Sequence, residues 1–183
     1  MSNFSPELNH ETHGHFRTNG WVVVENVFDL NDVQRIAQVA STVADDLVGT
    51  STMSTDHTDD GELIPRKIPR AFTRHEAFRK FVLDPTLTKI LESLLGAPPL
   101  LLTDQVIMKP PRHGSAKPYH QDNAYFRIHP ADQAITAWIA LDDVDVGERR
   151  GAGRPTAPAR ARVSRSASRA GRARRAGCHA PSP

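Results

Sequence analysis

Residues 109–143 read KPPRHGSAKPYHQDNAYFRIHPADQAITAWIALDD and contain the clearest strand pattern in the chain. From Ala134 to Leu141, apolar side chains recur at every second position, with Thr136 and Trp138 between them. Successive side chains of a strand point to opposite faces of a sheet, so this alternation predicts a strand with one apolar face. The other face carries a hydroxyl group and an indole.

The same stretch contains a candidate metal site, His120 and Asp122, with one residue between them. We expect a strand over Tyr119–Phe126, in which side chains two residues apart project from one face. An imidazole and a carboxylate are two of the three ligands in the 2-His-1-carboxylate sites of non-haem iron oxygenases. The third ligand, a histidine, must then come from another strand. Taken alone the pattern is weak, because a His/Asp pair on a strand also occurs as a simple polar pair.

The part of the chain before this stretch is predicted to be mainly helical. The expected elements are a strand over Trp21–Phe28, a helix over Asn31–Val48 with Asn31 as its N-cap, a short helix over His75–Leu83, a helix from Asp84-Pro85 to Gly96, and a strand over Leu100–Lys109. Residues 49–63 are polar and are expected to form a long loop. Helices that precede antiparallel-type strands favour an α+β domain or a barrel with helices packed outside it.

The charge of the chain is divided between two unlike parts. The formal net charge is +2, from 23 basic and 21 acidic residues. Residues 147–183 hold ten Arg and one Glu, which gives +9, so residues 1–146 carry −7. Val163 is the one sizeable aliphatic residue of the basic part, and we expect this tail to be disordered. Residues 1–15 are polar and are expected to form a solvated arm.

The composition also excludes several classes of protein. No apolar run approaches the roughly 18 residues that a membrane-spanning helix needs. The N-terminus lacks the basic and apolar regions of a secretory signal. The single cysteine, Cys178, allows neither an internal disulfide nor a cysteine-based zinc site. We therefore expect a cytoplasmic protein without a membrane partner.

Three motifs occur in order along residues 16–146. They are Phe16 with Asn19-Gly20-Trp21 and a run of Val, then Gln105 with Lys109-Pro110-Pro111, Gly114 and His120-Gln121-Asp122, and finally the strand from Trp138 to Asp143. Together they resemble the first half or more of the phytanoyl-CoA dioxygenase family of Fe(II)/2-oxoglutarate-dependent oxygenases. The resemblance implies an α+β fold with a double-stranded β-helix (jelly-roll or cupin-like) core and N-terminal helices, incomplete at its C-terminal side.

The resemblance also implies roles for individual residues. His120 and Asp122 are expected to bind Fe(II), and Gln105, Trp138 and Lys67 are expected to contact 2-oxoglutarate as cosubstrate. The alternatives are core packing for Trp138 and a plain surface position for Lys67. The implied reaction is hydroxylation of a small organic substrate, with 2-oxoglutarate converted to succinate and CO2. A carboxylate ligand at Asp122 favours hydroxylation over halogenation, because it occupies the coordination position that a halide needs.

The resemblance ends near residue 146. The family continues with further strands, a distal histidine ligand and an arginine that binds 2-oxoglutarate, whereas this chain continues with Arg, Ala, Gly and Pro. These residue types have GC-rich codons, so we interpret residues 147–183 as the product of a frameshift near residues 145–150. Neither His113, His129 nor His179 is at the position of the distal histidine. The chain is therefore expected to be an inactive fragment, with 16–146 as its partial oxygenase domain.

Two other classes of function stay open at this point. A non-catalytic metal-binding module of the cupin kind fits His120 and Asp122. The Arg-rich tail could bind nucleic acid through phosphate contacts. It has no aromatic residue on which bases could stack, so nucleic acid is not the partner that we expect.

Overall fold

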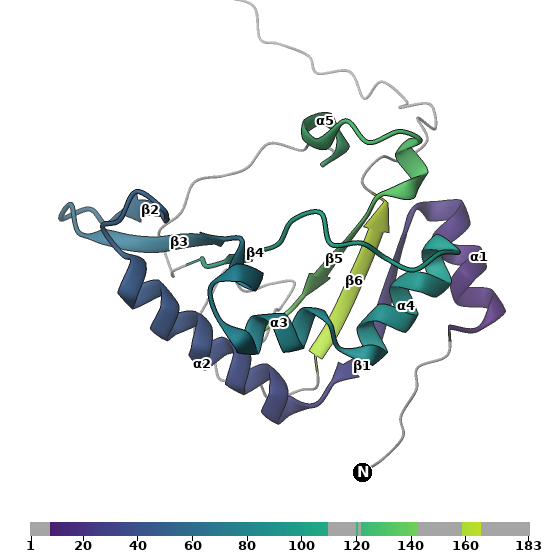
Figure 1. The fold of residues 1–183 in the computed structure, drawn as a ribbon, viewed down its shortest axis with the longest axis horizontal. Coiled ribbons are helices and arrows are strands. Elements are labelled where there is room, and N and C mark those ends of the chain that lie inside the picture. The colour runs from purple at the N-terminus through teal and green to yellow at the C-terminus, as the bar shows by residue number, and fades with distance from the viewer. Residues whose placement is uncertain (1–7, 110–119, 121, 143–158, 166–183) are drawn as a thin grey trace, which may run out of the picture.

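The computed structural model describes residues 8–109, 120, 122–142 and 159–165, which form helices and two antiparallel sheets (Figure 1). In chain order the elements are α1 (His10–Asn19), β1 (Trp21–Phe28), α2 (Leu30–Leu47), β2 (Ser54–His57), β3 (Leu63–Pro69), η1 (Ala71–Thr73), α3 (Glu76–Val82), α4 (Pro85–Leu95), β4 (Gln105–Ile107), α5 (Asn123–Phe126), η2 (Ala131–Gln133), β5 (Ile135–Ile139) and β6 (Ala159–Arg165). The predicted mixture of helices and antiparallel strands is thus present.

The strands form two three-stranded sheets in which every neighbouring pair is antiparallel. Sheet A has the strand order β1-β6-β5, and sheet B has the order β2-β3-β4. The central strand of sheet A is the last strand in the described part of the chain. Sheet A therefore joins the beginning of the described chain to its end.

Helices cover the apolar face of each sheet (Figure 1). On sheet A, Val22 and Val24 of β1 share one core with Val163 of β6 and with Leu87 and Ile90 of α4. The core of sheet B is formed by buried residues from α2, β3 and α3, namely Ile36, Ala40, Ala44, Ile68 and Phe78. The opposite faces of the two sheets carry exposed apolar side chains, which include Trp21, Val23, Ile107 and Trp138.

The helix ends follow local sequence signals. Asp84 caps α4, because its Oδ1 accepts hydrogen bonds from the backbone N–H groups of Thr86 at 2.8 Å and Leu87 at 3.4 Å. Gly96 ends the same helix in the left-handed region, at φ 77°. Asp29 caps α2, so the prediction of Asn31 as the N-cap is wrong, and Asn31 lies inside the first turn.

Several predicted elements differ from the observed ones. Residues 49–63 are only partly a loop, because Ser54–His57 pairs with β3 as strand β2. The predicted strand over Leu100–Lys109 is limited to Gln105–Ile107. The residues of Tyr119–Phe126 that the structure describes do not form a strand, and Asn123–Phe126 is a short helix. Helix α1 begins at His10, inside the polar arm expected over residues 1–15.

The basic tail also contains structure that its composition did not predict. Ala159–Arg165 forms β6, which pairs with β1 on one side and β5 on the other. Val163 is fully buried and packs in the core of sheet A. Pairing on both sides satisfies the backbone groups of this strand, and Val163 anchors it to the core. The rest of the tail lies outside the described residues.

No helix in the described part of the chain has the length and apolar composition that crossing a membrane requires.

Replacing Val163 tests whether β6 is part of the folded core. Val163→Ala removes two buried methyl groups from a fully buried site and is expected to lower the free energy of unfolding by about 2 kcal/mol. Val163→Asp buries a carboxylate there and is expected to cost more. Urea denaturation of the purified chain measures both effects. Ser164→Ala, one position along the same strand, is the control and should change stability by less than about 1 kcal/mol. Equal stability of Val163→Asp and the parent chain would show that β6 is not packed.

Candidate metal centre

His120 and Asp122 lie side by side just before α5. Nε2 of His120 is 3.5 Å from Oδ1 of Asp122, and the two side chains are 43% and 36% exposed. Ligand atoms about 2.1 Å from an octahedral metal ion are about 3 Å apart when they occupy neighbouring positions. The nitrogen and the oxygen are therefore close to the spacing of two neighbouring ligands. The two side chains lie close together, as predicted. The strand that was predicted to bring them together is not observed among the described residues.

A tight turn fixes the backbone on which Asp122 is placed. The carbonyl oxygen of Asp122 accepts hydrogen bonds from the N–H groups of Tyr125 at 2.9 Å and Phe126 at 3.3 Å. The side chain of Asn123 pairs with both backbone groups of Ile128, accepting from its N–H at 2.7 Å and donating to its carbonyl at 3.0 Å. Such side-chain pairing with the backbone replaces the hydrogen bonds of a regular element. It closes the turn of α5 after the candidate ligand.

Tyr125 contacts the candidate ligand His120 from the turn of α5. The two rings meet edge to face, with centroids 5.9 Å apart and an interplanar angle of 83°. Aromatic rings favour this T-shaped arrangement. Because Tyr125 itself is 73% exposed, it forms an outer wall beside His120 rather than part of the core.

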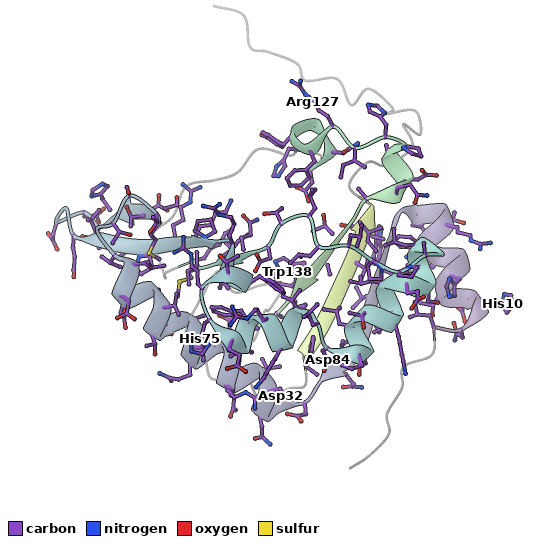
Figure 2. All side chains as sticks on the ribbon, viewed as in Figure 1. His10, Asp32, His75, Asp84, Arg127 and Trp138 are labelled. Carbon is purple, nitrogen blue, oxygen red and sulfur yellow. The ribbon has the colours of Figure 1, made fainter. Side chains whose placement is uncertain are left out.

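A hydrogen bond connects Asp122 of the candidate ligand pair to sheet A. The Oγ1 hydroxyl of Thr136 in β5 donates to Oδ2 of Asp122 at 2.7 Å. Trp138 lies two residues further along β5, so both side chains are on the same face of the strand. The intervening Ala137 pairs with Val163 and packs on the apolar core. The face of β5 that holds Asp122 is therefore also the face of Trp138, whose indole lies near the middle of the view in Figure 2.

Lys67 and Gln105 lie on sheet B. Ile68 and Val106 face each other in the register of β3 and β4, and both pack on the core around α2. The alternation of side chains places Lys67 and Gln105 on the opposite face of the sheet. Lys67 is half-buried, and Gln105 is exposed. Lys67, Gln105 and Trp138 thus lie on sheet faces away from the helix layer, and Asp122 is connected to the face of Trp138 through Thr136.

A third ligand is not present in the described part of the chain, which contains no group of three His, Cys, Asp or Glu side chains able to hold a metal ion. His129 is exposed and lies after α5. His113 and His179 fall outside the described residues. The structure therefore brings two candidate ligands together.

Sequence reasoning did not identify three residues that shape the site, namely Asn123, Tyr125 and Thr136. Thr136 was predicted to lie on the polar face of its strand, which is correct, but this pattern does not reveal a contact with Asp122. The turn residues Asn123 and Tyr125 could have been found from the Asp-Asn pair, which is typical of side-chain-supported turns.

The sequence is similar to known enzymes along most of the described chain. The family model of phytanoyl-CoA dioxygenase (PhyH) matches residues 16–151. The peroxisomal phytanoyl-CoA dioxygenase of Bos taurus is 28% identical over 141 residues, which cover 71% of this chain and 42% of that protein. A phytanoyl-CoA dioxygenase domain-containing protein 1 homolog of Caenorhabditis briggsae is 24% identical over 168 residues, which cover 72% of this chain and 58% of that protein. The chain thus spans about half the length of these curated relatives.

Solved structures share the fold at low sequence identity. The crystal structure of AviO1 from Streptomyces viridochromogenes Tue57 matches with a TM-score of 0.65 and 14% identity, covering 87% of this chain and 85% of that one. EctD from S. alaskensis with bound Fe matches with a TM-score of 0.59 and 18% identity, covering 76% and 48%. The epimerase SnoN, in complex with Fe3+, alpha ketoglutarate and nogalamycin RO, matches with a TM-score of 0.58 and 19% identity, covering 85% and 73%.

These likenesses confirm the predicted α+β fold with its jelly-roll core. The family match covers most of the chain, including both candidate ligands and Trp138. The chain therefore belongs to the phytanoyl-CoA dioxygenase family of Fe(II)/2-oxoglutarate-dependent oxygenases.

Proposed function

We propose that His120 and Asp122 are two ligands of an Fe(II) centre that uses 2-oxoglutarate to hydroxylate a small organic substrate. The observation that carries this proposal is the 3.5 Å approach of Nε2 of His120 to Oδ1 of Asp122. An imidazole nitrogen and a carboxylate oxygen are the donor types that non-haem iron sites use, so the pair fits the metal. When bound, Fe(II) and 2-oxoglutarate would activate O2, the oxidant, for attack on a C–H bond.

The other residues on the same faces of the sheets are proposed to receive the cosubstrate. Trp138 presents an indole, 47% exposed, on the face of β5 that also holds Asp122. Lys67 supplies a positive charge suited to a carboxylate of 2-oxoglutarate, and Gln105 supplies an amide that can donate or accept. In the related SnoN and in EvdO2 from Micromonospora carbonacea var. aurantiaca, crystal structures contain alpha ketoglutarate or 2-oxoglutarate. Similarity to these proteins supports the proposed cosubstrate.

We further propose that this chain does not complete the reaction. After His129 the sequence contains one histidine, His179, in the basic segment that follows the family match. A site with two protein ligands holds a metal less firmly than one with three. The proposed frameshift near residues 145–150 accounts for the change of composition, and resequencing of the locus tests it. An uninterrupted reading frame for this tail in independent isolates would contradict it.

Metal binding by the ligand pair is the first measurement that tests the proposed function. The full chain is expected to bind Co(II), used as an air-stable stand-in for Fe(II), with a dissociation constant in the micromolar range or weaker. His120→Ala and Asp122→Ala are each expected to weaken binding at least tenfold in isothermal titration, because one ligand remains. His129→Ala removes an exposed histidine outside the pair and serves as the control. Unchanged affinity in both ligand variants would contradict the assignment.

Turnover is the second measurement, and it separates a catalytic centre from a metal-binding module. The purified chain, supplied with Fe(II), 2-oxoglutarate and oxygen, is expected to release no succinate above a protein-free control. Metal binding without turnover is the expected combination. Sustained succinate release that depends on His120 would show that the chain is a complete catalyst.

A further inference from the structure

We propose that Thr136 is a positioning residue that orients Asp122 for metal binding, an inference that rests on the proposed iron site. Oγ1 of Thr136 donates to Oδ2 of Asp122 at 2.7 Å, while Oδ1 of the same carboxylate is the oxygen near His120. The two carboxylate oxygens therefore have different partners. One is held by the sheet, and the other is directed to the place where a metal ion would meet both ligands.

The hydrogen bond restrains the part of Asp122 that the turn leaves free. The backbone of Asp122 is held by the N–H groups of Tyr125 and Phe126, but these contacts do not define the torsions of its side chain. Thr136 supplies the missing restraint from a separate element. Its β-branched side chain has few rotamers, and its backbone is fixed in β5 opposite Ser164. A hydroxyl that donates to a carboxylate forms a short, charge-assisted bond of the kind observed here.

The alternation of β5 makes this restraint specific to one register. Ala137 lies between Thr136 and Trp138 and packs on the core, opposite the fully buried Val163. A shift of one residue would turn Thr136 and Trp138 into the core and Ala137 outward. The position of the candidate ligand Asp122 is therefore coupled to that of Trp138 through one strand. Outer hydrogen bonds of this kind typically change metal affinity by about 10- to 100-fold when they are removed.

Three variants of the full chain test this role. Thr136→Val keeps the shape of the side chain and removes the hydroxyl, and Thr136→Ser keeps the hydroxyl. Thr88→Val is the control, because it removes a hydroxyl that donates to the carbonyl oxygens of Asp84 and Pro85 at the start of α4. Isothermal titration with Co(II) is expected to show about tenfold or greater loss of affinity for Thr136→Val. Thr136→Ser and Thr88→Val are expected to stay within about threefold of the parent chain.

A second readout needs no metal. Hydrogen exchange of the amides of Tyr125 and Phe126 is expected to become faster in metal-free Thr136→Val. Both amides donate to the carbonyl oxygen of Asp122, and this variant removes the hydrogen bond that connects the side chain of Asp122 to the sheet. Parent-like exchange and Co(II) affinity in Thr136→Val would overturn the proposal. Equal losses in Thr136→Ser and Thr136→Val would also overturn it, since they would indicate packing rather than the hydroxyl. A parent chain that binds no Co(II) would overturn the proposed iron site itself, whichever variant is compared.

Discussion

The pairing of β6 with both β1 and β5 is the constraint on which the candidate site depends. β5 has β6 as its neighbour in sheet A, and β6 in turn is held by β1 and by the buried side chain of Val163. Asp122 is connected to this arrangement through Thr136. The position of a candidate ligand before α5 thus depends on a strand that comes from the far end of the described chain. An apolar contact in the core and a polar contact at the site are linked by one sheet.

The two faces of each sheet carry different residues. One face packs in the core, and the other carries candidate site residues. On β5, Ala137 and Ile139 pack on the core, whereas Thr136 and Trp138 face the other way. On β3 and β4, Ile68 and Val106 pack on the core around α2, which leaves Lys67 and Gln105 on the opposite face. Helices cover one face of each sheet, so the other, exposed face can carry polar groups at little cost in buried polar atoms. This explains why Lys67, Gln105 and Trp138 lie away from the helix layer.

The elements that could be predicted from sequence are those with complete local signals. Trp21–Phe28 was predicted with its observed bounds, since it is a β-branched run behind a glycine turn. Helix α4 was predicted because Asp84-Pro85 and Gly96 mark its two ends. The hairpin of β2 and β3 was not predicted, because Ser54–His57 is polar and owes its structure to backbone pairing with Leu63–Lys67.

The elements that escaped prediction depend on distant partners or on individual side chains. Ala159–Arg165 has the composition of a disordered segment, and its structure comes from pairing with two strands far away in sequence. Helix α5 depends on the hydrogen bonds of Asn123 with Ile128, which no periodic pattern reveals. The pairing of His120 with Asp122 was foreseen from their spacing, but a turn produces it instead of a strand. The contact between Thr136 and Asp122 spans 14 residues and could be seen only in the fold.

The surroundings of the pair add no third His, Cys, Asp or Glu ligand from the described part of the chain. Across sheet A, the residues in register with Thr136 are Ser164 in β6 and Trp21 in β1, a hydroxyl and an indole rather than a third strong ligand. Oδ2 of Asp122 is already engaged by Thr136, which leaves Oδ1 for a metal ion. In the proposed iron centre, Asp122 would then occupy one coordination position through Oδ1, beside that of His120. A metal ion at the proposed centre would therefore have two protein ligands from the described residues, and its remaining positions would be open to solvent, cosubstrate or other groups.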